Sequence, residues 1–442
     1  MMFEKYDAYK DSGVDWLGEI PSNWEIKRLK APLAERNEKN DPIKTDFILS
    51  LTMHQGVIPQ SEKTGGGNKP KEDLTAYKLA RPYDIVLNSM NVIVGSVGLS
   101  KYFGVVSPVY YMLYARDGSK TNISYYNYIF QSQAFQRNLG RLGTGILIKK
   151  SESSGKLNTI RMKISMEDLN NELLPIPSLS EQNKIVDFLN RKTFEIDQAI
   201  AIKEQQITLL NERKQIVIQK AVTQGLDPNV PMKDSGVEWM GKIPEHWEVK
   251  KIKYATKIFR GKFTHRPRND PSLYDGKYPF FQTGDVAKAG KFLVDFKQTL
   301  NEKGLRISTL IPKGTVVITI AANIGDVSIL GVDACFPDSI VGFQPTELLD
   351  RDFLFYSLLS MKNQFVNSSI KNTQMNLNVD RIGSNYICVC PKGEQINIVQ
   401  KIEEFDVNFA NAIDLLNREI EKLKEYKTTL INDAVTGKIK VA

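Results

Sequence analysis

Histidine and cysteine are the side chains most often used to bind metals or to act as catalytic bases and nucleophiles, and this 442-residue chain holds few of either. Its three histidines, His54, His246 and His265, have no second histidine or cysteine at metal-ligand spacing. Cys388 and Cys390 form a lone Cys-x-Cys pair, with only Cys335 left over. We therefore expect buried strand thiols rather than zinc ligands, and we predict no metal site.

A phosphate-binding loop is nearly spelled by Gly236 to Lys242, GVEWMGK, but Ile243 stands where Ser or Thr would bind magnesium. A similar segment near the N-terminus carries Glu19 in place of the lysine. The sequence has no glycine-rich S-adenosylmethionine loop, no Asn-Pro-Pro-Tyr signature of a DNA methyltransferase and no convincing acidic cluster for a nuclease metal. We therefore predict that the chain is not an enzyme and binds no cofactor itself.

Polar and basic loops are the remaining candidates for a function. Arg and Lys contact phosphates or guanine edges, and Asn and Gln offer the donor and acceptor pair that adenine requires. The candidate DNA-binding residues in the first half are Lys63, Thr64, Lys69, Lys71, Asn88, Asn91, Lys149, Lys150, Ser151 and Lys156. Those in the second half are Arg260, Lys262, His265, Arg266, Arg268, Lys371, Asn372, Gln374 and Asn376. Solvated loops are the alternative interpretation.

An internal duplication must position these loops. KDSGVDWLGEIPSNWE at 10–25 returns as KDSGVEWMGKIPEHWE at 233–248, an offset of 223, and the two copies hold all four tryptophans. Downstream, Glu181-Gln182 matches Glu394-Gln395 at an offset of 213. The blocks between these matches therefore differ in length by 223 − 213 = 10 residues, whereas the segments after Glu-Gln keep their length.

The segments of constant length read as two long helices. Residues 181–224 contain no Pro or Gly, Ser180 resembles an N-cap, and Gly225 and Gly437 stand where C-terminal glycines belong. Apolar residues recur at a period of about 3.5 to 3.6, which predicts a narrow seam and an intramolecular coiled coil. The seam residues are Ile196, Ile200, Ile207, Leu210 and Val217 in the first helix and Phe409, Ile413, Leu416, Ile420, Leu423 and Leu430 in the second.

The blocks before these helices read as mixed α and β structure. β-branched runs broken by glycine at 84–95 and 105–114, and at 314–330, predict strands, with Gly95 and Gly325 at equivalent places. Helix-like stretches follow at 125–139 and 351–365. Lys and Arg exceed Asp and Glu by 59 − 51 = 8, and the sequence has neither a signal-peptide core nor an apolar run of bilayer-spanning length. We expect about two to four domains and, with no membrane segment, a cytoplasmic protein.

This layout resembles the specificity subunit of type I restriction-modification systems. The resemblance covers essentially the whole chain and rests on the paired segments 11–24 and 234–247, the helix entry 175–186 and the exit AVTQGLD at 221–227. The segment before the second helix, CPKGEQ at 390–395, lacks the proline-rich stretch that precedes the first. The sequence therefore does not determine where the second helix begins.

The resemblance implies two α/β (α+β) target recognition domains joined by two long antiparallel helices. We expect recognition domains at 1–180 and 226–393 and conserved spacer helices at 181–225 and 394–442. Each domain would read one half of a bipartite, asymmetric sequence in double-stranded DNA. The helices would set the spacer and dock two modification subunits, while restriction subunits complete the complex. S-adenosylmethionine, ATP and magnesium would belong to those partners. The alternatives are an enzyme with a cryptic site and a scaffold that binds only proteins.

Overall fold

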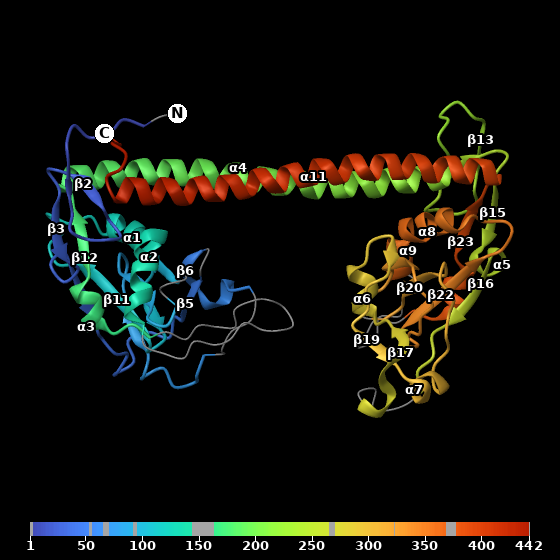
Figure 1. Cartoon of the computed structure of the whole chain (residues 1–442), viewed down its shortest axis with the longest axis horizontal. Coiled ribbons are helices and arrows are strands. Elements are labelled where there is room, and N and C mark those ends of the chain that lie inside the picture. The colour runs from blue at the N-terminus through green and yellow to red at the C-terminus, as the bar shows by residue number, and fades with distance from the viewer. Residues whose placement is uncertain are drawn as a thin grey trace. The chain divides into compact units, whose positions relative to one another are not determined.

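The structure is a computed structural model that describes residues 3–52, 55–64, 70–91, 95–143, 163–264, 270–321, 323–367 and 377–441. It divides into two compact units. Unit 1 comprises Met1–Lys203 and Arg418–Ala442, and unit 2 comprises Glu204–Asn417. The two long helices, α4 (Leu179–Gln224) and α11 (Lys392–Val435), each contribute one part to unit 1 and another to unit 2. Figure 1 shows α4 and α11 side by side and running in opposite directions.

Unit 1 is built on an antiparallel sheet of order β4-β11-β8-β9. These strands are Leu33–Arg36, Tyr110–Ala115, Ile85–Asn88 and Val97–Leu99. Smaller antiparallel pairs join β5 (Leu49–Thr52) to β6 (Gly56–Pro59), β7 (Lys78–Ala80) to β10 (Gly104–Val106), and β3 (Glu25–Arg28) to β12 (Leu173–Ile176). The helices of the block are α1 (Ile123–Gln131), α2 (Gln133–Leu139) and α3 (Met166–Asn171).

Unit 2 repeats this sheet with one strand more, in the order β16-β22-β20-β21-β18. The strands are Thr256–Arg260, Ile340–Pro345, Val316–Thr319, Val327–Leu330 and Phe292–Leu293. Around it lie β15 (Glu248–Lys251) paired with β23 (Tyr386–Val389), and β17 (Tyr274–Phe280) paired with β19 (Gln298–Leu300). The shorter helices are α5 (Ile252–Ala255), α6 (Thr283–Lys288), α7 (Glu302–Arg306), α8 (Arg351–Ser360), α9 (Lys362–Asn367) and α10 (Val379–Ser384).

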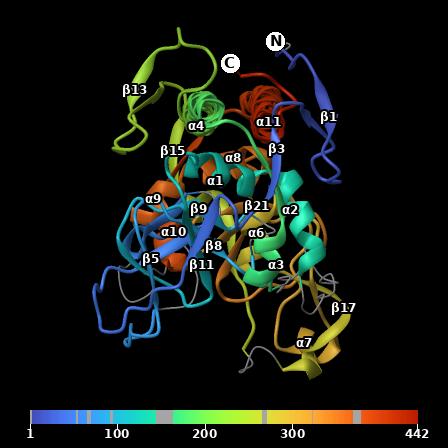
Figure 2. The same cartoon turned by 90° about the vertical axis from the view of Figure 1, so that its left-hand side faces the viewer.

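The repeated tryptophan segment folds as a hairpin, β1 (Tyr9–Asp11) with β2 (Glu19–Pro21) in unit 1 and β13 (Met232–Asp234) with β14 (Lys242–Pro244) in unit 2 (Figure 2). In each turn an aspartate accepts a hydrogen bond of 2.9 Å from the glycine amide two residues on, Asp11 from Gly13 and Asp234 from Gly236. The Asp-Ser-Gly motif is therefore explained by turn geometry. The segment 236–242, which nearly matches a phosphate-binding loop, is the turn of this hairpin. It leads into strand β14 and not into a helix, as a phosphate-binding loop would.

Each hairpin segment packs near the C-terminal end of the long helix that ends in its unit, α11 in unit 1 and α4 in unit 2. Gly437 adopts a φ of +73°, and a Cβ there would stand 2.3 Å from Pro21 Cδ. Gly225 adopts a φ of +75° beside Trp247. The predicted C-terminal glycines are thus confirmed, since only glycine takes this backbone conformation without strain.

The helical predictions need three corrections. Ser180 lies inside α4, and the hydroxyl that accepts from the Glu181 amide is that of Ser178, at 3.3 Å. The stretch 125–139 is two helices, because Ser132 ends α1 and caps α2. The stretch 351–365 likewise breaks at Met361, between α8 and α9.

Charged side chains occupy the seam of the helix pair together with the predicted apolar residues, all of which are buried or half-buried. Lys214 and Asp406 fall on seam positions and form an ion pair of 3.2 Å in unit 2. In unit 1, Lys203 pairs with Glu419 at 2.5 Å and Lys427 with Asp197 at 2.7 Å. These pairs tie the antiparallel helices together in one register, as polar seam residues do in coiled coils.

Candidate DNA interface

The five predicted DNA-binding residues of the first block that the structure describes lie at two places in unit 1. Lys63 and Thr64 follow the short 3-10 helix Gln60–Glu62, and the Lys71 amide donates to the Tyr77 hydroxyl at 3.1 Å. Asn88 and Asn91 form the turn after β8, joined by a backbone hydrogen bond of 3.0 Å. The Asn88 side chain accepts from the Met90 amide at 3.0 Å, so it shapes the turn.

In unit 2, Arg260 ends β16, and Lys262 is the exposed residue two positions later. The Arg260 guanidinium donates to the Asp338 carbonyl at 3.2 Å. The other candidates lie outside the described residues: Lys69, Lys149, Lys150, Ser151, Lys156, His265, Arg266, Arg268, Lys371, Asn372, Gln374 and Asn376.

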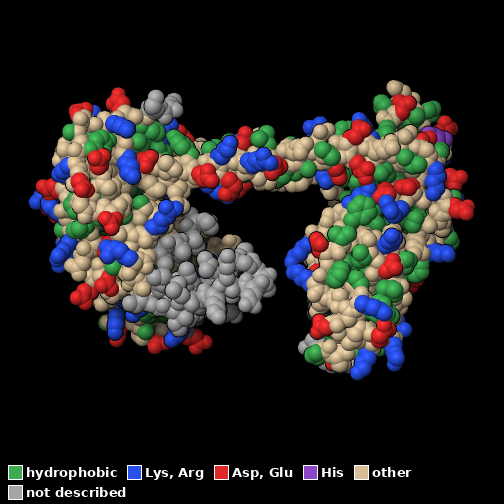
Figure 3. Space-filling model, in the orientation of Figure 1, with side chains coloured by type: hydrophobic (Ala, Val, Ile, Leu, Met, Phe, Trp, Pro, Cys, Tyr) green, Lys and Arg blue, Asp and Glu red, His purple; other side chains and the backbone are tan. Residues whose placement is uncertain are grey.

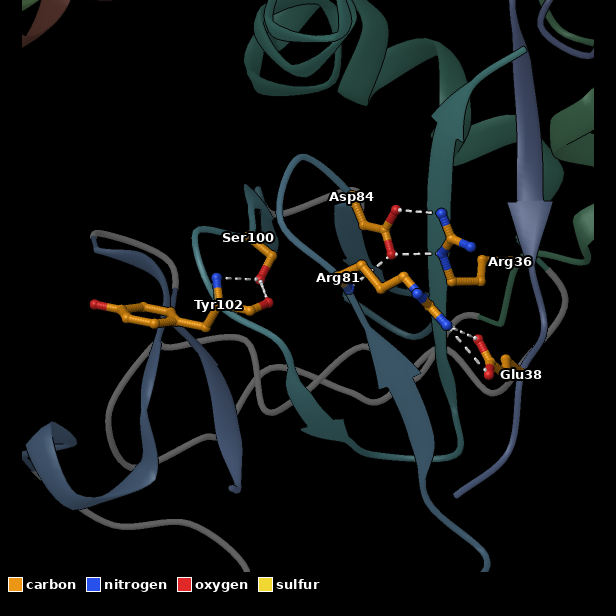
Figure 4. Close-up of polar contacts among 6 residues, drawn as sticks. All are labelled: Arg36, Glu38, Arg81, Asp84, Ser100 and Tyr102. Atoms are coloured by element: carbon orange, nitrogen blue, oxygen red, sulfur yellow. Dashed lines mark hydrogen bonds and ion pairs between the residues drawn. The ribbon is translucent and has the colours of Figure 1, made fainter. Parts of the chain in front are cut away.

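A charged cluster that the sequence analysis missed joins β4 to the turn before β8 in unit 1 (Figure 4). The Asp84 carboxylate, 1% exposed, accepts from Arg36 Nε at 2.9 Å and from the Arg81 amide at 2.8 Å. The Arg81 guanidinium reaches Glu38 at 3.0 Å, and Lys44 contacts the same carboxylate. Arg36 and Asp84 are 48 residues apart, so no spacing pattern connects them.

Burial and charge act in opposite directions on the acids of this cluster. Desolvation raises the pKa of Asp84 by more than Arg36 and Arg81 lower it. Glu38 is more open, and hydrogen bonds from Lys44 and Arg81 lower its pKa. Both acids are thus held by cations, and the Asp84 carboxylate braces the turn from inside.

A second charged cluster links the block of unit 2 to α11. Lys291 contacts Asp352 at 2.6 Å and also reaches Glu403 on α11, while Arg351 contacts Asp352 at 2.7 Å. Burial raises the pKa of Asp352, but the contacts with Lys291 and Arg351 outweigh it and hold that pKa below its usual range. This cluster fixes the block to the helix.

The glutamine of each repeated Glu-Gln pair ties the start of a long helix to the block that precedes it. Gln182 is fully buried, donates to the Pro177 carbonyl at 2.9 Å and accepts from the Asn122 amide at 2.8 Å. Gln395, also fully buried, donates to the Cys390 carbonyl at 2.7 Å and accepts from the Asp350 amide at 2.6 Å. Since Asn122 and Asp350 are the N-caps of α1 and α8, the two glutamines play the same role in the two units.

The interpretation of the cysteines as buried thiols is confirmed: Cys335, Cys388 and Cys390 are free and buried. Burial raises the pKa of the Cys388 thiol to about 12. Within the described residues, no three His, Cys, Asp or Glu side chains come together as a metal site would require. None of the helices described here has the length and apolarity of a bilayer-crossing segment.

Comparison with known proteins places this architecture. Residues 244–425 match the family model described as the type I restriction modification DNA specificity domain. The putative type I restriction enzyme MjaX specificity subunit of Methanocaldococcus jannaschii is 24% identical over 456 residues, covering 100% of this chain and 99% of that protein. The MjaVIII specificity subunit of the same organism is 26% identical over 287 residues, covering 61% of this chain and 62% of that protein.

The fold is also found among solved structures. A chain from a structure of a type I restriction-modification system superposes with a TM-score of 0.66 at 15% identity, covering 94% of this chain and 98% of that one. The predicted fold class, two α/β blocks joined by long antiparallel helices, is confirmed. The second copy of the duplicated chain thus matches the type I restriction modification DNA specificity domain, and the chain over its whole length is similar to a specificity subunit of such a system.

Proposed function

We propose that this chain is the DNA sequence-recognition subunit of a type I restriction-modification complex and performs no catalytic step itself. The block of unit 1 would read one half of a bipartite target in double-stranded DNA, and the block of unit 2 the other half. Because the two blocks differ in sequence, the target would be asymmetric. The helices α4 and α11 would set the spacer between the half-sites.

The observation that carries this proposal is that the two units share the same sheet while their loops differ in sequence. The order β4-β11-β8-β9 in unit 1 recurs as β16-β22-β20-β21 in unit 2, with the same antiparallel pairing. On this shared frame the basic loops differ in sequence between the copies. A shared frame with divergent loops suits two modules that bind one kind of polymer but read different base sequences.

Two modification subunits and the restriction subunits would complete the complex in the cytoplasm, carrying S-adenosylmethionine, ATP and magnesium. The helices offer a surface for docking them. Ile202, Leu209 and Ile216 of α4 recur every seventh residue, away from the seam, and are 53–57% exposed. Hydrophobic side chains lie among the charged ones on the visible face of the helices (Figure 3). Exposed apolar residues at one helical position favour a partner helix as the occupant.

The proposal is tested by expressing the chain with its modification subunits in a host that lacks them and sequencing the methylated adenines. A bipartite, asymmetric motif is expected. Replacing residues 1–180 by the corresponding block of another specificity subunit should change one half-site only. A change in both half-sites, or in neither, would contradict the assignment of one half-site to each block.

The same system separates the alternatives. An enzyme with a cryptic site would methylate or cleave DNA as purified chain alone with S-adenosylmethionine and magnesium. A scaffold that binds only proteins would assemble with the modification subunits, yet the complex would retain no DNA fragment. The predicted loop contacts can be tested there too: replacing Lys149, Lys150 and Lys156 should lower the salt dependence of DNA binding, by about one unit of slope per lost phosphate contact.

A further inference from the structure

Tyr83 occupies an unusual position in the turn between β7 and β8. Its φ is +67°, in the left-handed region that residues other than glycine rarely adopt. Its side chain is 72% exposed, the largest exposed fraction among the exposed large hydrophobic residues that the structure describes. A bulky aromatic residue is therefore held in a disfavoured conformation without contributing to the core.

Unit 2 contains the same turn with glycine in that place. The Tyr83 amide donates to the Ser100 carbonyl at 2.8 Å, and the Gly314 amide donates to the Leu330 carbonyl at 2.7 Å. The residue that follows closes each turn in the same way, Asp84 onto Arg81 at 3.0 Å and Thr315 onto Pro312 at 3.4 Å. Gly314 has a φ of +82°. Glycine adopts the conformation of this turn with less strain than tyrosine does. The backbone of the turn therefore does not explain why tyrosine stands at this position.

Hydrogen bonds to the buried Asp84 hold the turn that carries Tyr83. The buried Asp84 carboxylate binds the Arg81 amide and the Arg36 guanidinium, and the Arg36 guanidinium also stacks over the Tyr114 ring, 4.6 Å from its centroid. Unfavourable backbone conformations persist when their surroundings hold them, and they cluster at functional sites. Within the described residues the Tyr83 ring itself has neither a hydrogen-bond partner nor a ring contact.

Two exposed basic residues lie near Tyr83 along the chain and across its turn. Arg81, two residues before Tyr83, is exposed, with its guanidinium 5.7 Å from the centroid of the Phe103 ring, and the exposed Lys101 follows Ser100, whose carbonyl accepts from the Tyr83 amide. The acids nearby, Glu38 and Asp84, are each held by two basic residues. An exposed aromatic ring with exposed basic residues nearby suits a nucleic acid, whose bases and sugars stack on rings and whose phosphates pair with Arg and Lys.

A protein partner is disfavoured by the duplication. A subunit that docks on both units would use residues that recur in both, but Arg81, Tyr83 and Lys101 correspond to Pro312, Gly314 and Gly331. The cluster belongs to the first block alone. In the proposed function, what differs between the two blocks is the half-site that each reads.

We propose that Tyr83, flanked by Arg81 and Lys101, contacts the DNA half-site read by the first block, with its ring against a base or sugar and the cations on phosphates. This inference rests on the proposed function. It assigns a specificity-determining residue to one half-site and predicts no counterpart in the other.

The test is Tyr83→Gly in the complex with modification subunits, using a fluorescent duplex that carries the methylated motif of the wild-type complex. Relief of the left-handed conformation should leave the melting temperature of the chain equal or higher. The affinity for the duplex should fall by about tenfold, as expected for a lost stacking contact. Methylation should become more permissive in the first half-site only. Gly314→Ala is the matched control, and it should lower the melting temperature without altering the first half-site.

Each other outcome has a distinct meaning. A lower melting temperature for Tyr83→Gly would give the ring a structural role and overturn the inference. So would unchanged affinity together with an unchanged motif. Weaker assembly with the modification subunits, while the assembled fraction binds DNA normally, would assign Tyr83 to a protein contact instead. If the wild-type complex binds no duplex and methylates no motif, the proposed function itself fails.

Discussion

Two buried glutamines, Gln182 and Gln395, tie the start of each long helix to the block that precedes it. Their side chains bind main-chain groups that would otherwise be buried without partners, including the amides of the residues that cap α1 and α8. The sequence shows that Glu-Gln is repeated but not what the glutamines do, because the helix-capping residue that each one binds lies far upstream, 60 residues before Gln182 and 45 before Gln395. The same holds for Arg36 with Asp84.

Replacing Gln182 with leucine should destabilise unit 1. The Pro177 carbonyl would stay buried and the Asn122 amide half-buried without their partner, at a cost of about 1–3 kcal/mol in the free energy of unfolding. Denaturant unfolding followed by circular dichroism measures the loss, with the exposed neighbour substitution Lys184→Ala as the control. Equal stability for the two variants would show that Gln182 is not a buried hub.

The ion cluster around Asp352 predicts a pH-dependent contribution to stability. Because the folded pKa of Asp352 lies below its unfolded value, the contribution is present above about pH 4, the unfolded value, and is lost as pH falls through the folded pKa. Asp352→Asn should therefore cost about 1 kcal/mol at pH 7, and the difference from wild type should shrink below about pH 4. Asp295→Asn, at an exposed position, is the control substitution. A constant difference across this range would argue against the ion pairs.

At the scale of elements, the long helices were the most predictable part and the short ones the least. The apolar seam recurs over many turns, so periodicity alone predicts the helices to within a few residues of the observed Leu179–Gln224 and Lys392–Val435. The helix breaks at Ser132 and Met361 were not predicted, because single residues that end a helix leave the apolar pattern unchanged. The charges at Lys214 and Asp406 interrupt the seam at positions where an apolar residue would also fit.

The Lys214 and Asp406 pair should set the register of the helices in unit 2. Lys214→Asp alone would place two carboxylates together in a half-buried seam, and we expect a loss of about 1–2 kcal/mol. Adding Asp406→Lys should restore most of that loss, because the opposite charges meet again in the exchanged order. A double-mutant cycle by urea unfolding measures the coupling. If the two losses simply add, the pair does not interact and the register has another origin.

At the scale of the whole molecule, the duplication was evident in the sequence, since it rests on matched rare residues and not on weak propensities. The base contacts were not, because the identity of a loop residue does not say where its side chain lies. Many of the predicted contact residues, Lys149 and Gln374 among them, lie outside the described residues and stay predictions. Tyr83 stands out only in the structure, through its positive φ, its exposure and the glycine at the equivalent place in unit 2.

The helices predict how the target can be re-engineered. A heptad inserted after Leu210, matched by a heptad inserted after Ala412 in the antiparallel partner, keeps every seam residue in place and lengthens both helices by about 10 Å. We expect the spacer of the methylated motif to grow by about three base pairs while both half-sites stay the same. The motif of the variant complex is the measurement. An active complex with an unchanged spacer would mean that the helices do not determine the spacing.

Because unit 1 is closed by Arg418–Ala442, the order of synthesis and the order of folding should differ. Domains usually fold as they leave the ribosome, the N-terminal one first. Here the unit that is made second is a single stretch, Glu204–Asn417, whereas the unit that is made first lacks one of its parts until residues 418–442 have been synthesised. The Tyr125 hydroxyl, for example, donates to the Val435 carbonyl, 310 residues later. Some apolar residues of the first block therefore stay exposed until residues 418–442 pack against it. Its folding should depend more on chaperones, and suffer more from premature stop codons, than the folding of the second block.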